Sequence, residues 1–249
     1  MIRAAALAAV LAVWALVSYG NRQFEVIPPA VLPTPTEVAS TAIALVGDGS
    51  LIRHVGISLL RIAEGFGIAA AAALVLGVLV GLCPPLRLML EPVIEFVRPI
   101  PPLAFLPMFL VWFGLGETSK VAFIAYTTFF PMFVGIAASL LRVDVMLLRA
   151  AASLGAGRAT LLRHVVLPAA LPGIVVALRL GLGLALFVIV GAEFMGADAG
   201  LGHLIMEGRV FGQPAQIVMG ALLLGILGSA INALLLGCER RLLGGRAPS

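Results

Sequence analysis

The stretch FGIAAAAALVLGVLVGLC, residues 66–83, has no charged side chain over 18 consecutive positions. A helix that crosses a membrane needs about 20 predominantly apolar residues. A transmembrane strand would instead need segments of about 10 residues in which polar and apolar side chains alternate. Because this stretch is apolar on every side, it predicts a helix that lies in a lipid bilayer.

The rest of the chain has the same character. Its 249 residues are 61% hydrophobic and 11% charged, whereas soluble domains are about half apolar and about a quarter charged. We therefore predict an all-α integral membrane protein, a single transmembrane domain over residues 1–249 with about six helices. The predicted spans are residues 4–21, 62–83, 93–116, 119–141, 171–193 and 214–238.

The first predicted span has an alternative interpretation. A short basic start at Arg3, an apolar stretch and the small residues Ser18 and Gly20 are also typical of a cleaved signal peptide. Removal of this segment would leave the topology of the other five helices unchanged.

Basic side chains in the loops predict the orientation. With the N-terminus inside, cytoplasmic segments hold nine of the 16 basic residues and exterior segments hold five. Positive charge is enriched in short cytoplasmic loops. We therefore predict that both termini are cytoplasmic, together with the basic loop of residues 142–170. The cytoplasmic set includes Arg3, Arg87, Arg142, Arg149, Arg158, Arg163, Arg240, Arg241 and Arg246.

The loop of residues 142–170 predicts two short helices. Helix-forming residues run from Arg149 to Leu154, and Gly155 follows where a left-handed residue would end a helix. A second helix is expected from Arg158 to Val166, before Pro168 and Pro172 redirect the chain. An amphipathic loop that lies on anionic lipid would have the same composition, so the residues alone leave both interpretations open.

These residues resemble a family motif. Ala150-Ala151, Gly155 and Val165-x-Leu167-Pro168 match the spacing of the E-A-A-x-x-x-G-x9-I-x-L-P loop in membrane subunits of binding-protein-dependent ABC importers. Arg149 stands where that family has an acidic residue. Four other stretches resemble the nitrate, sulfonate, taurine and bicarbonate branch of these permeases: Leu32–Val38, Arg98–Ala104, Trp112–Glu117, and Ala192-Glu193 followed by Gly200-Leu-Gly202.

The resemblance implies a type I importer in a bacterial cytoplasmic (inner) membrane. Its expected partners are a second permease copy, two cytoplasmic ATPases, an extracytoplasmic binding protein and membrane lipid, with no nucleic acid. ATP and Mg would be held by the ATPases, since Lys120 is the only lysine here and no P-loop precedes it. We thus expect a non-enzymatic chain without a cofactor. The residues expected to couple it to the ATPase are Arg149, Ala150, Ala151, Leu154, Gly155, Val165, Leu167 and Pro168.

Charged residues inside the spans are candidates for a translocation path or gate, because a charge in the bilayer must be paired or face water. Glu95 and Arg98 are three residues apart and could form an ion pair on one helix face. Pro101 and Pro102 predict a broken helix just after them. Arg179 could attract an anion or contact another helix. Glu193 could form part of the binding-protein surface or a capped, solvated helix end.

Other features carry less information about function. Cys83 and Cys238 lie in or beside apolar runs, so no disulfide framework is expected. We predict no metal site and no catalytic set around the three histidines. Small-residue spacings predict close helix packing; they are Gly77-x-x-x-Gly81, Ala221-x-x-x-Gly225 and Gly225-x-x-x-Ser229.

Three classes of function remain at this stage. The first is an ABC importer permease that carries a small, anionic solute. The second is a secondary transporter or channel, for which coupling-ion carboxylates at mid-membrane or a repeated hydropathy pattern would be expected. The third is a membrane scaffold without transport activity.

Overall fold

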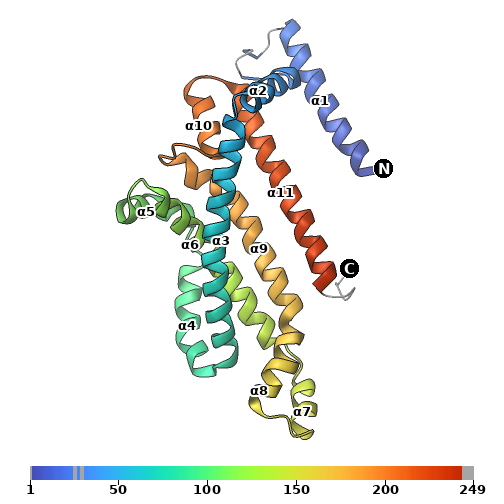
Figure 1. Cartoon of the computed structure of the whole chain (residues 1–249), viewed down its shortest axis with the longest axis vertical. Coiled ribbons are helices and arrows are strands. Elements are labelled where there is room, and N and C mark those ends of the chain that lie inside the picture. The colour runs from blue at the N-terminus through green and yellow to red at the C-terminus, as the bar shows by residue number, and fades with distance from the viewer. Residues whose placement is uncertain (1, 25–26, 29–30, 243–249) are drawn as a thin grey trace. The chain divides into compact units, whose positions relative to one another are not determined.

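The computed structural model describes residues 2–24, 27–28 and 31–242, and within these every regular element is helical (Figure 1). Four helical segments are long and apolar enough to cross a membrane: α3 (Ser50–Leu82), α6 (Glu117–Leu141), Arg158–Phe194, and Pro214–Gly237 of α11 (Pro214–Leu242). They overlap our second, fourth, fifth and sixth predicted spans, which stay predictions as membrane spans. Lipid offers no hydrogen-bond partner to the backbone, which is why such apolar stretches are helical.

The third predicted span, 93–116, is broken after Arg98, as the prolines predict. The chain forms α4 (Pro84–Val97), a short 3₁₀ turn at Pro102–Phe105 and α5 (Leu106–Phe113), and the two parts are bent by 82°. Prolines at positions 99, 101 and 102 remove three backbone donors, so a continuous helix cannot form there. Hydropathy alone does not register this break.

α4 also corrects the placement of Arg87. We predicted that Arg87 lies in a cytoplasmic loop, but only Cys83 separates α3 from α4, and Arg87 is in the first turn of α4. Pro84 and Pro85 favour a helix start because the first helical residues need no backbone donor.

The first predicted span forms the 23-residue helix α1 (Ile2–Phe24), which is not among the four long apolar segments above. It is followed by α2 (Pro35–Gly47). The motif Leu32–Val38 builds the start of α2. The Thr34 side chain accepts a hydrogen bond from the Glu37 backbone N–H, and the Glu37 carboxylate accepts one from the Thr34 N–H. This backbone hydrogen bond lowers the pKa of Glu37, and Arg22, which forms an ion pair with Glu37, lowers the pKa further.

The chain divides into two compact units, residues 1–59 with 193–227 and residues 60–192 with 228–249. In the first unit a small core joins α2, the start of α3, α10 (Leu201–Val210) and α11 through Val38, Leu51, Leu204 and Met219. In the second unit the main core lies among α3, α6 and α9 (Leu167–Phe194). The single domain over residues 1–249 stays a prediction.

Glycines allow α3 and α6 to pack closely in the second unit. A Cβ added at Gly77 would lie 2.8 Å from Ile136, and one at Gly81 would lie 2.7 Å from Leu140. The predicted packing role of Gly77-x-x-x-Gly81 is therefore confirmed. Gly225 differs, because a Cβ there would meet no atom within 4 Å in the described part of the chain.

The predicted break at Leu167-Pro168 is wrong. α8 (Arg158–Leu161), a π-helical turn at Leu162–Val166 and α9 form one continuous helix of 37 residues. The Leu167 N–H donates to the Leu162 carbonyl, five residues back. This wider turn lies directly before Pro168, which has no N–H to contribute, so the helix accommodates the proline without ending.

Candidate functional site

The basic loop folds as a helix, a tight turn and a second helix. α7 (Val145–Ser153) begins at Asp144, whose carboxylate accepts a hydrogen bond of 2.8 Å from the Met146 N–H. α8 begins after Gly157. α7 and α8 lie together at one end of the long α8–α9 helix (Figure 1). The first predicted short helix is present as α7, which starts four residues earlier than the stretch that we quoted. The second, predicted from Arg158 to Val166, is instead the start of the long α8–α9 helix.

Gly155 ends α7 as the sequence predicts. Its φ is +83°, its N–H donates to the Ala152 carbonyl at 3.0 Å, and the Ala156 N–H donates to the Ala151 carbonyl at 3.1 Å. These two bonds form a Schellman motif, which requires a left-handed residue at this position. The turn therefore depends on glycine for its backbone conformation and not for space, because no atom lies within 4 Å of an added Cβ.

The turn carries an exposed apolar side chain. Leu154 is 89% exposed, and Arg149, Ala150 and Gly155 are exposed beside it, while Ala151 is half-buried. On the opposite side Leu148 and Leu167 pack against the core of the second unit. Val165 is half-buried and Pro168 is exposed. The loop thus joins the bundle core to a free, largely small-residue surface.

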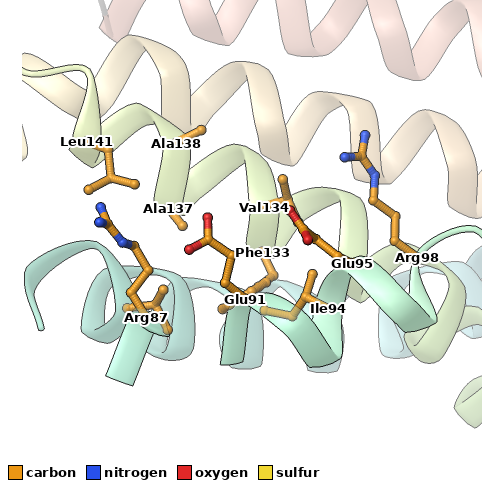
Figure 2. Close-up of a pocket in the computed structure, with 11 residues that line it drawn as sticks. Arg87, Glu91, Ile94, Glu95, Arg98, Phe133, Val134, Ala137, Ala138 and Leu141 are labelled. Atoms are coloured by element: carbon orange, nitrogen blue, oxygen red, sulfur yellow. The ribbon is translucent and has the colours of Figure 1, made fainter. Parts of the chain in front are cut away.

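A second candidate site lies between α4 and α6. A cavity of about 190 Å³ is lined by Arg87, Glu91, Glu95 and Arg98 of α4 and by apolar residues of α6. Figure 2 shows these four side chains extending from α4 toward Phe133, Val134, Ala137, Ala138 and Leu141. Arg87 and Glu91 were not among the predicted site residues, because the predicted span began at residue 93. The four-residue spacing of Arg87, Glu91 and Glu95 was the available signal.

The predicted Glu95–Arg98 ion pair does not form. Across the described ranges, no ion pair or hydrogen bond involves the side chain of either residue. Arg98 is the residue at which α4 ends, and its guanidinium points away from the Glu95 carboxylate (Figure 2). Pro101 directly precedes the 3₁₀ turn, which starts at Pro102.

Arg98 also lines a larger cavity, of about 580 Å³, between α6 and α9. This cavity contains a second guanidinium, from Arg142, and the hydroxyl of Ser139, and its lining includes no carboxylate. Pro131 and Pro172, one inside each helix, lie on its walls. The two cations in its lining favour a positive potential in this cavity, whereas the cavity beside α4, which Arg98 also lines, contains Glu91 and Glu95.

Arg179 forms the structural contact that we considered as one of two alternatives. Its Nε donates to Asn232 Oδ1 of α11 at 3.2 Å. The bond joins two long apolar helices, where a polar side chain is costly without a partner. Asn232 thus has a hydrogen-bond partner on α9.

Glu193 lies in the interior of the first unit, with 1% of its surface exposed. Its carboxylate accepts hydrogen bonds from the Ser58 hydroxyl and the Gly202 N–H, each 2.7 Å long. A carboxylate at the start of α10 is stabilised by the free backbone donors there. The motif Ala192-Glu193 with Gly200-Leu-Gly202 is therefore a buried helix cap, and the solvated or exposed position that we predicted for Glu193 is wrong.

Two further polar contacts were not predicted. Arg61 donates to Glu117 through Nε at 2.5 Å and through a second nitrogen at 2.7 Å, and Lys120 donates to the carbonyls of Leu115 and Gly116. The rings of His54 and His203 stack with centroids 5.8 Å apart. Over the residues that the structure covers, no group of three or more His, Cys, Asp or Glu is placed to hold a metal ion.

Several apolar spans, charged cavities between helices and an exposed helical loop define a membrane transport protein. Residues 65–242 match the family described as "Binding-protein-dependent transport system inner membrane component". The chain is 36% identical over 241 residues to the taurine transport system permease protein TauC of Escherichia coli (strain K12), covering 95% of this chain and 86% of that protein. The chain belongs to this family of inner-membrane permease components of ABC transporters.

Other relatives are named for different substrates. The putative aliphatic sulfonates transport permease protein SsuC of Bacillus subtilis (strain 168) is 34% identical over 236 residues, which cover 95% of this chain and 84% of that protein. The bicarbonate transport system permease protein CmpB of Synechococcus elongatus is 32% identical over 187 residues, with 75% and 67% coverage.

Solved structures agree on the fold. An inward-facing structure of the MetNI methionine ABC transporter superposes with a TM-score of 0.66 at 22% identity, covering 78% of this chain and 94% of that chain. The resemblance to ABC importer permeases is therefore confirmed, and family membership sets aside the secondary transporter, the channel and the scaffold.

Proposed function

We propose that this chain forms, with a second copy, the translocation path for a small anionic solute. An extracytoplasmic binding protein delivers the solute and two cytoplasmic ATPase subunits drive its passage. The bacterial inner membrane holds the pair with both termini in the cytoplasm. Arg246, one of the arginines behind this orientation, lies outside the described residues.

The cavity between α6 and α9 carries the proposal for the solute. Arg98 and Arg142 both line it, and no acidic side chain lies on its walls. Guanidinium groups bind carboxylate, sulfonate and similar oxyanions through two parallel hydrogen bonds. Relatives named for taurine, aliphatic sulfonates and bicarbonate, each of which has an anionic group, support the same choice.

α7 and its glycine turn are the proposed contact with the ATPase. Leu154 is almost fully exposed, and Arg149, Ala150 and Gly155 surround it. Small side chains let another protein's backbone approach closely, and an apolar side chain such as Leu154 can fill a groove on the partner. Ala151, Val165, Leu167 and Pro168 support this surface from the bundle side.

We propose that the partner ATPase subunits, and not this chain, bind ATP and Mg. Lys120 is the only lysine in the chain. Its side chain is 3% exposed, and its ammonium group donates to two backbone carbonyls. A P-loop lysine must instead reach the phosphates of the nucleotide.

Uptake by the reconstituted importer tests the anion path. Proteoliposomes with wild-type permease, ATPase and loaded binding protein are compared with Arg98→Gln and Arg142→Gln variants, using labelled sulfonate, bicarbonate and nitrate. We expect each variant to lower uptake about tenfold or more for the solute that wild type carries, the loss of about 1.4 kcal/mol of binding. Arg53→Gln, an exposed position near the start of α3, is the matched control. Wild-type uptake in both cavity variants would refute the proposed path.

A further inference from the structure

We propose that the cavity between α4 and α6 recognises a small zwitterion. Glu91 and Glu95 hold its ammonium group, while Arg98 holds its sulfonate or carboxylate group. The inference rests on the proposed function and narrows it, since an anion path by itself requires no carboxylates.

The first observation is that α4 is amphipathic and that its charged face lines the cavity beside α6. Charged residues follow each other at intervals of four, four and three, which places them on one helix face, and all line the cavity against α6. The opposite face is apolar and 57–75% exposed, at Leu88, Met89, Val93 and Phe96. A soluble helix would have the reverse arrangement. Glu91, Glu95 and Arg98 are exposed, so these charges face an open cavity between two helices, and charged side chains beside such cavities in membrane proteins mark substrate pathways.

The second observation is that these charges do not neutralise each other. Within the part of the chain that the structure describes, the side chains of Arg87, Glu91, Glu95 and Arg98 take part in no ion pair or hydrogen bond. The Nε atom of Arg87 is buried and has no hydrogen-bond partner. A buried donor without a partner is unfavourable by about 1–3 kcal/mol. The cavity therefore offers both signs of charge to a ligand.

The third observation assigns the two ends of the ligand. Arg98 lines both this cavity and the positive cavity that contains Arg142, so the anionic group belongs beside Arg98. Positions 95 and 98 are separated by about 4.5 Å along a helix at a rise of about 1.5 Å per residue. A solute whose charged groups are separated by two or three bonds can span such a distance. The ammonium group then lies at Glu95, with Glu91 one turn further along α4.

Binding to the permease itself tests the inference, because the binding protein selects solutes on its own. The permease–ATPase complex in nanodiscs, without binding protein, is titrated with 2-aminoethanesulfonate and with ethanesulfonate, which lacks the amine. We expect the wild-type complex to prefer the zwitterion by about tenfold or more, equivalent to about 1.4 kcal/mol. Glu95→Gln and Glu91→Gln should reduce the preference severalfold while leaving ethanesulfonate bound.

Glu64→Gln is the matched control, because Glu64 lines a separate cavity with Glu117 and should keep the wild-type preference. Basal ATPase activity reports whether each variant is folded and assembled. Equal binding of both probes to wild type, no measurable binding of either, or an unchanged preference in both variants would overturn the inference. Any of these outcomes would overturn the zwitterion site alone. The proposed anion path would still be supported if Arg98→Gln and Arg142→Gln lower uptake, so failure of one proposal can be told from failure of the other.

Discussion

Replacement of Gly155 by valine should uncouple the importer without affecting solute binding. Gly155 has a φ of +83°, and a left-handed conformation is unfavourable by about 1–2 kcal/mol for an L-residue, with β-branched residues at the upper end. The bonds from Gly155 to Ala152 and from Ala156 to Ala151 depend on this conformation. If valine moves the backbone out of it, both bonds are lost, each worth about 0.5–1.5 kcal/mol.

Loss of the two hydrogen bonds would destabilise the ordered turn by about 1–3 kcal/mol. This corresponds to a roughly five- to 150-fold smaller population of the ordered turn. The assay is ATP hydrolysis by the reconstituted complex with and without loaded binding protein. Stimulation should fall severalfold or more in Gly155→Val. Gly155→Asn should retain it, because asparagine tolerates the left-handed region, and so should Gly157→Ala, whose φ is −71°.

The comparison of Gly155→Val with Gly155→Asn tests the effect of backbone conformation. Neither side chain meets a steric clash at its Cβ, since no atom lies within 4 Å of a Cβ at position 155. Wild-type stimulation in Gly155→Val would refute the argument for the turn. An equal loss in Gly155→Asn would refute the conformational explanation, because a side chain of any kind would then block the contact.

Other predictions concern different parts of the chain. Gly200→Ala should destabilise the first unit by about 2–6 kcal/mol, the sum of overpacking and backbone strain, because its Cβ would lie 2.4 Å from the Glu193 carboxylate. Thermal unfolding in detergent measures this, and an unchanged midpoint would contradict the buried cap. Single cysteines at positions 49 and 158, in a background without Cys83 and Cys238, should label with an impermeant maleimide in intact cells only at 49, and labelling at 158 would invert the topology. Light scattering should give two permeases with two ATPases, since a closed two-fold pair provides each ATPase with one loop; a fully active lone monomer would exclude this assembly.

Much of the fold follows from local chemistry in the sequence. Uncharged runs such as residues 66–83 must be helical, because the hydrocarbon core offers no other partner for the backbone. Gly155 signals the end of α7 by its conformational freedom, and the Thr34–Glu37 spacing signals the start of α2. Such features depend on residues that are close together in the chain, so the amino-acid sequence alone is enough to predict them.

Contacts between distant residues were decided only by the tertiary structure. The pairing of Glu193 with Ser58, 135 positions away, turned a predicted surface carboxylate into a buried cap. Arg98 lines the same cavity as Arg142 and forms no ion pair with Glu95 within the described residues. Hydropathy and spacing describe how polar a segment is, but the partner of a buried charge depends on which helices pack together. That choice is made by side-chain shape, as at Gly77 and Ile136.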